Sequence, residues 1–162
     1  MVDQPEGIGS HMKVDVFQPL EGPILPSMRP LVYLASPYSH QDPDMRELRY
    51  DLVVKAMAWL INNANVDVFS PIAMCHNVAK SHELPKDFEF WQGFNINTLR
   101  RCDALWVLLL PGWESSKGVN YEIKYAQDNG IKIATVTSIP LHDGYAIAEF
   151  VMKVIDINEE DR

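Results

Sequence analysis

A long hydrophobic run is absent from this sequence. The longest apolar stretch, Ala104 to Pro111, falls far short of the roughly 20 residues that a transmembrane helix needs. The N-terminus also lacks the basic region followed by an apolar segment that marks a secretory signal peptide. We therefore expect no membrane partner and no signal peptide.

Cysteine and positive charge are scarce. Cys75 and Cys102 fit neither a CxxC nor a metal-binding spacing, which favours a reducing, cytoplasmic location. The 22 acidic residues outnumber the 14 basic ones and give a net charge of -8 at pH 7. This balance argues against a nucleic-acid polymer as the partner, because phosphate backbones bind basic surfaces. A small anionic ligand remains compatible, since a few backbone N–H groups can hold one phosphate.

Common nucleotide and metal motifs are missing too. Neither GxGxxG nor GxxxxGK[ST] occurs after any predicted strand, which leaves a dinucleotide-binding fold or a P-loop unsupported. His40, His76 and His82 have no metal-ligand spacing, and each is compatible with a place in a solvated loop.

Proline and glycine are concentrated in residues 1–30, which show no hydrophobic period. Such a segment predicts a flexible N-terminal tail. Gly9-Ser10-His11-Met12 is typical of residues left by an expression vector, so part of the tail is a candidate non-native addition. Residues 31–162 are predicted to form a single domain, which is long enough to bury a core.

The domain alternates short apolar runs with amphipathic ones. We predict strands at Leu31–Ala35, Val66–Phe69, Ala104–Leu110 and Ile131–Val136. We predict helices from Met45 to the asparagines at 62–65, and at about Phe88–Cys102, Val119–Asp128 and Tyr145–Ile155, with a loop and a short helical turn over Ile72–Pro85. This order indicates an α/β fold, Rossmann-like or flavodoxin-like, with a parallel sheet of about five strands and helices on both faces.

In such sheets ligands bind beyond the carboxyl ends of the strands. Glu122 follows the third predicted strand near the start of a helix, where the helix dipole would stabilise its anion. Ser116 precedes the same helix, where it would cap the helix or grip a phosphate. Bland alternatives remain open: Glu122 as a surface residue, Ser116 as a simple cap, and Tyr33 and Trp91 as core residues.

Three sequence blocks resemble the nucleoside 2-deoxyribosyltransferase-like superfamily, which includes deoxynucleoside 5′-monophosphate N-glycosidases and an uncharacterised branch of the DUF1937 type. They are Val32–Pro37, Asn95–Ala104 and Ser116–Ala126. The third block is similar to the pattern S-x-G-V-x-Y-E, in which the glutamate is the nucleophile. Val68–Pro71 also matches a common ending of the second strand.

This resemblance implies cleavage of the N-glycosidic bond of a 2′-deoxynucleoside or its monophosphate, with Glu122 attacking C1′ and water or a second base as acceptor. Tyr33 would hydrogen-bond Glu122 and orient it. The expected binding residues for the sugar, its phosphate and the base are Ser36, Ser39, Ser116, Gly118, His40, His76 and Trp91. The resemblance also implies no cofactor, and a homodimer or larger assembly that shares its active site.

Two departures from the family pattern are present. Asn95 stands where many members carry an aspartate that assists protonation of the leaving base, and an amide has no ionisable proton to give. Asp103, a histidine or solvent would then be the general acid, although Asp103 is also compatible with a capping role. Lys124 stands where the family often has glycine. Alternative functions are therefore an N-glycosidase for ribonucleotides or NAD-like substrates, and a non-catalytic nucleotide sensor.

Overall fold

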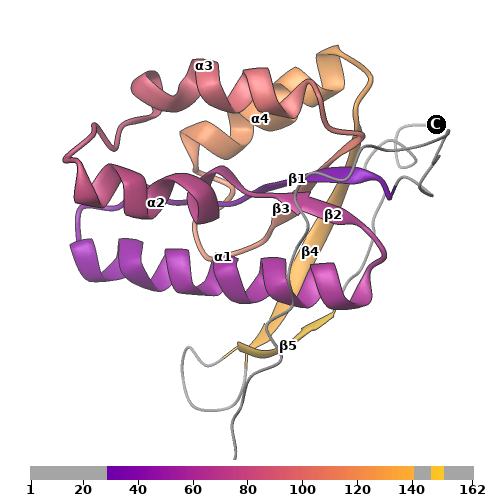
Figure 1. Cartoon of the computed structure of the whole chain (residues 1–162), viewed down its shortest axis with the longest axis horizontal. Coiled ribbons are helices and arrows are strands. Elements are labelled where there is room, and N and C mark those ends of the chain that lie inside the picture. Colours follow the sequence, from indigo (N-terminus) through magenta and orange to yellow (C-terminus); the bar gives the residue numbers. More distant parts are fainter. Residues whose placement is uncertain (1–28, 141–146, 152–162) are drawn as a thin grey trace, which may run out of the picture.

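The computed structural model of the chain describes residues 29–140 and 147–151. Its strands form one sheet in the order β2-β1-β3-β4-β5 (Figure 1). Four strands are parallel: β1 (Leu31–Ala35), β2 (Asp67–Phe69), β3 (Ala104–Leu108) and β4 (Lys132–Pro140). The predicted α/β fold is confirmed, with four parallel strands rather than five. Residues 1–28 of the tail predicted at 1–30 and the ends of the last predicted helix lie outside the described residues.

Helices cover both faces of the sheet, as predicted. On one face α1 (Pro43–Asn63) buries Leu52, Val53, Ala56 and Leu60, and α2 (Pro71–Ser81) lies beside it. On the other face α3 (Phe88–Leu99) lies beside α4 (Lys117–Asp128). Because neighbouring side chains of a strand point to opposite faces, β1 sends Val32 and Leu34 into the first core and Tyr33 and Ala35 into the second.

The prediction of a loop over Ile72–Pro85 is wrong for most of its length, because α2 occupies Pro71–Ser81. Ser70 caps this helix by accepting a hydrogen bond from the Ala73 N–H at 3.3 Å. Pro71 is at the first turn, where proline is favoured because its nitrogen needs no acceptor. The Ser-Pro pair that ends β2 is therefore also the start of a helix.

The prediction of a helix over Tyr145–Ile155 is also wrong where the structure describes it. Ile147–Val151 forms β5, which pairs antiparallel with β4, Thr137 facing Val151. Pairing with an available strand edge has overridden the local helical pattern, as tertiary context often does for short segments.

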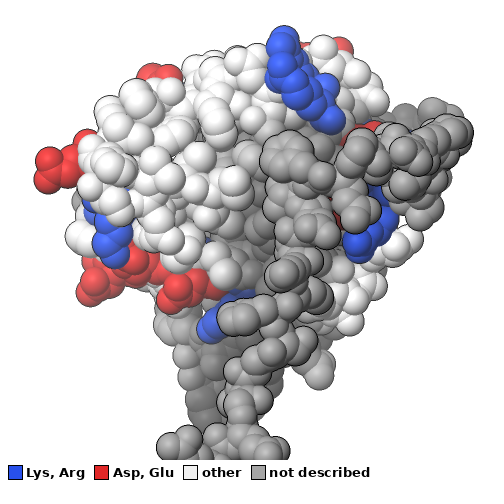
Figure 2. All heavy atoms as spheres, in the orientation of Figure 1, with Lys and Arg blue, Asp and Glu red and all other residues white. Residues whose placement is uncertain are grey.

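Apolar side chains are exposed on the two helices that border the site. Met74 and Val78 of α2 and Phe90 and Phe94 of α3 are 45–56% exposed. The view in Figure 2 shows few charged side chains over α2 and α3, whereas acidic side chains gather near α1. Within the described residues no helix is long and apolar enough to cross a membrane.

Candidate active site

A cavity of about 450 Å³ opens beyond the carboxyl ends of β1 and β3, where α2 and α4 begin. The sheet brings together segments that are distant in sequence, because its four parallel strands end at the same edge. Of the eleven predicted site residues, nine line the cavity: Ser36, Ser39, His40, His76, Trp91, Asn95, Ser116, Gly118 and Glu122. Tyr33 lies beneath it, and Asp103 lies elsewhere.

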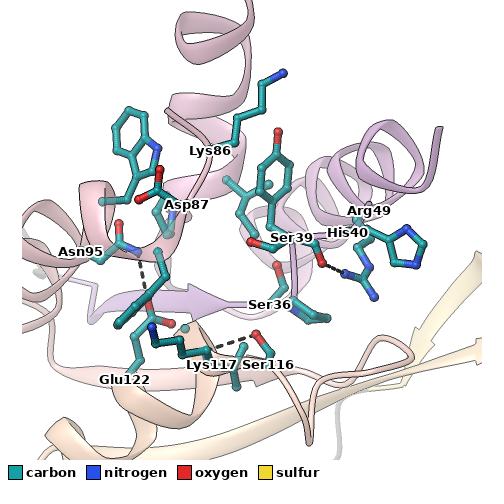
Figure 3. Close-up of a pocket in the computed structure, with 18 of the residues that line it drawn as sticks. Ser36, Ser39, His40, Arg49, Lys86, Asp87, Asn95, Ser116, Lys117 and Glu122 are labelled. Atoms are coloured by element: carbon teal, nitrogen blue, oxygen red, sulfur yellow. Dashed lines mark hydrogen bonds between the residues drawn. The ribbon is translucent and has the colours of Figure 1, made fainter. Parts of the chain in front are cut away.

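Glu122 is a buried carboxylate in the second turn of α4, with 4% of the residue exposed. Its Oε1 accepts a 2.6 Å hydrogen bond from the Tyr33 hydroxyl. It also accepts a 3.1 Å bond from Asn95 Nδ2 (Figure 3). The predicted hydrogen bond from Tyr33 is therefore present, and the alternative of a surface glutamate is wrong. Since both bonds go to Oε1, Oε2 is the oxygen left to meet a ligand.

The environment of Glu122 disfavours its charge. Burial raises the pKa of Glu122 to about 7, although the hydrogen bonds from Tyr33 and Asn95 act to lower it. Desolvation of the carboxylate thus outweighs its two hydrogen-bond donors. Burial and the Glu122 charge raise the pKa of Tyr33 well above 10, so Tyr33 stays a hydrogen-bond donor.

Two polar atoms at the cavity have no partner within the described part of the chain. They are Ser36 Oγ and Asn95 Oδ1, and both are fully buried. Buried polar atoms in native proteins are nearly always hydrogen-bonded, so each exception calls for an explanation such as a ligand. Asn95 is fixed through its Nδ2, which leaves its Oδ1 an acceptor for a hydroxyl or N–H group.

The start of α4 forms a second polar wall of the cavity. Ser116 caps the helix, its Oγ accepting from the Val119 N–H at 3.4 Å, which bears out the capping alternative for this residue. The N–H groups of Lys117 and Gly118 have no acceptor within the helix, as is general for a first turn. Such groups and the positive helix end suit an anion.

Arg49 also lines the cavity and adds a positive charge to it, and sequence reasoning missed this residue. Its Nη1 donates to Ser39 O at 2.8 Å and its Nη2 to Pro111 O at 3.1 Å, so it ties the loop after β1 to the loop after β3 (Figure 3). Gly112 has a φ of 90°, and a side chain there would meet Arg49 Nη2 at 3.2 Å. Arg49 comes from α1, and no local sequence feature links it to either loop.

The remaining predicted residues lie around the mouth or walls of the cavity. His40 is exposed, and its Nδ1 accepts from the Asp42 N–H at 3.1 Å. Trp91 donates through Nε1 to Pro85 O at 2.7 Å, which fixes the indole ring. His76 is buried, in a wall built by α2, rather than in the solvated loop that the sequence allowed.

Asp103 is not part of the site. Its Oδ2 accepts from the Leu31 N–H at 2.7 Å, and its N–H donates to Leu31 O at 2.8 Å. This pairing lies at the amino end of β1, about 16 Å of strand away from the cavity edge, at 3.3 Å per residue. The predicted catalytic role of Asp103 is therefore wrong, and its side chain instead holds the start of β1 through the Leu31 N–H.

No group of three or more His, Cys, Asp or Glu side chains that could hold a metal ion occurs in the described ranges 29–140 and 147–151. The cavity is lined by a shielded carboxylate, hydroxyls, an amide, the Arg49 guanidinium and the first turn of α4, which suits an anion. This set suits a neutral or anionic organic ligand that carries hydroxyl groups.

Comparisons with known proteins give one family. Residues 30–138 match the family described as "Domain of unknown function (DUF1937)". No curated protein matches the chain. Four chains of solved structure match, among them one described as "Crystal Structure of a prokaryotic SEFIR domain", which is 14% identical over 71% of each chain with a TM-score of 0.38. A likeness of that size supports no argument about function.

Proposed function

The chain belongs to the DUF1937 family of domains of unknown function, and for it we propose cleavage of the N-glycosidic bond of a 2′-deoxynucleoside or its 5′-monophosphate. The observation that carries the proposal is Glu122, a carboxylate held by Tyr33 and Asn95 through one oxygen with the other left for a ligand. The cavity of about 450 Å³ is within the size range of small-molecule sites.

In this reaction Glu122 Oε2 attacks C1′ on the face opposite the base. The C1′–N bond breaks with its electrons going to the base, and a glycosyl ester forms on Glu122. Water or a second base then attacks C1′ and frees the carboxylate, so the configuration at C1′ is retained overall. Tyr33 and Asn95 stabilise the ionised carboxylate that both steps require.

The other walls match the rest of such a substrate. Ser36 Oγ and Asn95 Oδ1, which have no partner in the described structure, are suited to the sugar hydroxyls. The first turn of α4 and Arg49 are suited to a 5′-phosphate. Trp91 and His40 border the remaining volume, where the base would lie.

A ribonucleotide or NAD-like substrate is the second candidate, and one observation favours it. Asn95 Oδ1 is a buried acceptor that needs a donor, and a ribose 2′-hydroxyl would supply one. The two candidates are separated by comparing each ribonucleotide with its 2′-deoxy counterpart, since a buried acceptor left unpaired costs roughly 1–3 kcal/mol.

The direct test is release of free base from deoxynucleosides, ribonucleosides and their monophosphates, followed by chromatography. We expect release by the wild type, loss of several orders of magnitude in Glu122→Ala, and little change in Glu114→Ala, an exposed glutamate ahead of the same helix. Acid-quenched protein should carry a glycosyl adduct on the peptide that contains Glu122. Nucleotide binding without release of base would contradict the enzyme function and favour a nucleotide sensor.

We also propose that copies of the chain pair. The exposed Met74, Val78, Phe90 and Phe94 lie on the two helices that flank the cavity, where a second copy would cover them and border the site. Light scattering in solution would show a particle of twice the 18.5 kDa chain, and a monomer at all concentrations would exclude pairing.

A further inference from the structure

A second series of hydrogen-bonded side chains reaches the cavity, and it has no part in the attack of Glu122 on C1′. The Tyr38 hydroxyl lies 2.8 Å from His76 Nδ1, and His76 Nε2 lies 3.3 Å from Glu47 Oε2. Tyr38 and His76 line the cavity, whereas Glu47 stands behind them on α1. The three side chains form a continuous line from the protein surface to the ligand volume.

The His76 ring is held on its faces and edges. Tyr50 stacks on it with centroids 4.1 Å apart and planes at 16°, and Tyr38 meets it edge-on. The second oxygen of Glu47 accepts from Lys80 Nζ at 3.0 Å, which fixes the carboxylate. Because both ring nitrogens have defined partners, the imidazole can exchange a proton with Tyr38 through Nδ1 while Nε2 faces Glu47.

The hydrogen atoms on Tyr38, His76 and Glu47 can be arranged in two ways. An ionised Glu47 only accepts, so His76 Nε2 carries a hydrogen. When Nδ1 is bare, Tyr38 donates its hydroxyl hydrogen to it. When Nδ1 also carries a hydrogen, it donates to the Tyr38 oxygen, and the Tyr38 hydroxyl hydrogen is free to point at a ligand. One proton on the imidazole therefore decides whether Tyr38 can act as a donor in the cavity.

The proposed reaction needs such a donor. A base that leaves C1′ takes both electrons of the bond and must gain a proton, and neither Asn95 nor the distant Asp103 can provide it. Burial raises the pKa of Tyr38; the charge of Arg46 opposes this rise, and that of Glu47 adds to it. Tyr38 therefore keeps its hydroxyl proton in the resting protein and can donate it.

We propose that Tyr38, His76 and Glu47 form the acid–base relay of the site, an inference that rests on the proposed N-glycosidase function. Tyr38 is the catalytic residue that touches the base, and His76 and Glu47 are positioning residues that supply and retain the proton.

The proton balance closes over one turnover. In the first step the C1′–N bond breaks, Glu122 Oε2 bonds to C1′, the base takes the Tyr38 proton, and Tyr38 takes the Nδ1 proton of the His76 imidazolium. In the second step water bonds to C1′, the ester releases the Glu122 carboxylate, and a proton from water passes through Tyr38 to Nδ1. The net reaction is hydrolysis, and the imidazolium is restored.

Two substrates with different leaving groups test this relay. One is the fastest of the four deoxynucleoside monophosphates, whose base needs a proton to leave. The other is 4-nitrophenyl 2-deoxyriboside 5-phosphate, whose nitrophenolate is stable without one. In Tyr38→Phe we expect base release to fall about 10²- to 10⁴-fold, the usual range for a general acid. Nitrophenolate should still appear in a first-turnover burst near the wild-type rate, followed by slow turnover.

Glu47→Gln tests the positioning residues without emptying the core, since Glu47 is 45% exposed. The charges of Arg46 and Glu47 of α1 act on Tyr38. Tyr50 of α1 stacks on His76, and Lys80 of α2 binds Glu47. Glu47→Gln replaces the carboxylate that accepts from His76 Nε2, so base release should slow while the nitrophenolate burst keeps its rate. A structural effect would change both.

Tyr125→Phe is the matched control, because it removes a phenolic hydroxyl from α4 outside the cavity, and thermal melting of each variant checks its fold. Equal losses on both substrates in Tyr38→Phe, or no loss on either, would overturn the relay while leaving the proposed function standing. If the wild type releases neither leaving group, or Glu122→Ala equals the wild type, the N-glycosidase function fails and the relay with it.

Discussion

At the scale of single residues, Tyr33 and Glu122 couple the hydrophobic core to the site. Tyr33 is fully buried in the second core, yet its hydroxyl reaches a carboxylate in the cavity wall. Burial opposes the charge of Glu122, and the two donors favour it. The balance places the pKa of Glu122 at about 7, near a neutral working pH, so small changes at its neighbours will alter its charge.

Replacing Tyr33 with Phe should shift the pH dependence of the reaction. The Tyr33 hydroxyl lowers the pKa of Glu122, so its loss raises that pKa, and the acid limb of kcat/KM moves to higher pH. A hydrogen bond to a charged group contributes roughly 1.5–3 kcal/mol, which corresponds to about a ten- to hundredfold loss in rate at pH 7. A pH–rate profile measures the shift, with Tyr125→Phe as the control. An unmoved limb would contradict the assigned nucleophile.

Replacing Glu122 with Gln should stabilise the fold at neutral and alkaline pH. The pKa of Glu122 is about 7 in the folded protein against an ordinary 4.5, so the folded state holds a proton that the unfolded state releases between these values. The contribution of this proton to the free energy of unfolding of the wild type is therefore fully present below pH 4.5 and is lost as pH rises through 7. The loss is on the order of 3 kcal/mol, and Gln removes it.

Thermal melting across pH 4.5–8 measures this effect. The Glu122→Gln melting temperature should exceed that of the wild type increasingly as pH rises, by roughly 2–4 °C for each kcal/mol. Glu114→Gln controls for the removal of an exposed carboxylate. A difference in melting temperature that stays constant or narrows with rising pH would show that burial does not disfavour the charge of Glu122.

At the scale of elements, the sequence predicts the strands better than the segments that join them. β1 and β3 are apolar on both faces, which is typical of central parallel strands, and their positions follow from that pattern alone. α2 escaped prediction because Ser70-Pro71 serves two purposes, ending a strand and capping a helix. β5 escaped because its strand state depends on pairing with β4, a contact that no local pattern encodes.

The site follows the same division. Glu122, Asn95 and Ser116 lie within blocks whose spacing resembles a known superfamily, and the strand order brings them together. Arg49 and Glu47 both lie on α1, and only tertiary packing brings Arg49 to the loops after β1 and β3 and Glu47 to His76 of α2. Side chains whose partners lie 10–62 positions away are beyond the reach of single-sequence patterns.

Ser116 tests the role of an element, since it caps the helix that carries Glu122. Ser116→Ala should cost about 1 kcal/mol of stability and should weaken a 5′-monophosphate more than its nucleoside, because the first turn of α4 loses its order. Ser70→Ala removes the equivalent cap of α2 and should leave the ratio of the two KM values unchanged. If Ser116→Ala changed the KM of both ligands equally, the start of α4 would not be the phosphate-binding site.

At the scale of the whole molecule, charge restricts the ligand. The chain carries a net charge of -8, yet Arg49 and the start of α4 give the cavity one locally positive wall. Long-range repulsion falls off within about 10 Å at 0.1 M salt, so a mononucleotide that enters the cavity meets the wall rather than the net charge. A polymer that lies across the surface does not.

We expect Glu122→Ala to bind a deoxynucleoside monophosphate without turnover, so this ligand should stabilise the variant, whereas an oligodeoxynucleotide of equal phosphate content should not. At a concentration of 100 times Kd the expected gain is about 2.7 kcal/mol, or several degrees of melting temperature. Differential scanning fluorimetry at two salt concentrations measures both ligands. Stabilisation by the polymer alone would assign the surface to nucleic acid instead.

The alternation of side chains along β1 has a consequence for how errors in this sheet would be detected. A slip of one residue exchanges the two faces of a strand, and here both faces are apolar, since Val32 and Leu34 fill one core and Tyr33 and Ala35 the other. Hydrophobicity alone thus discriminates weakly between the correct and the slipped pairing. Only the correct pairing brings the Tyr33 hydroxyl to Glu122. An assay of the proposed turnover would therefore also report whether β1 has the correct register.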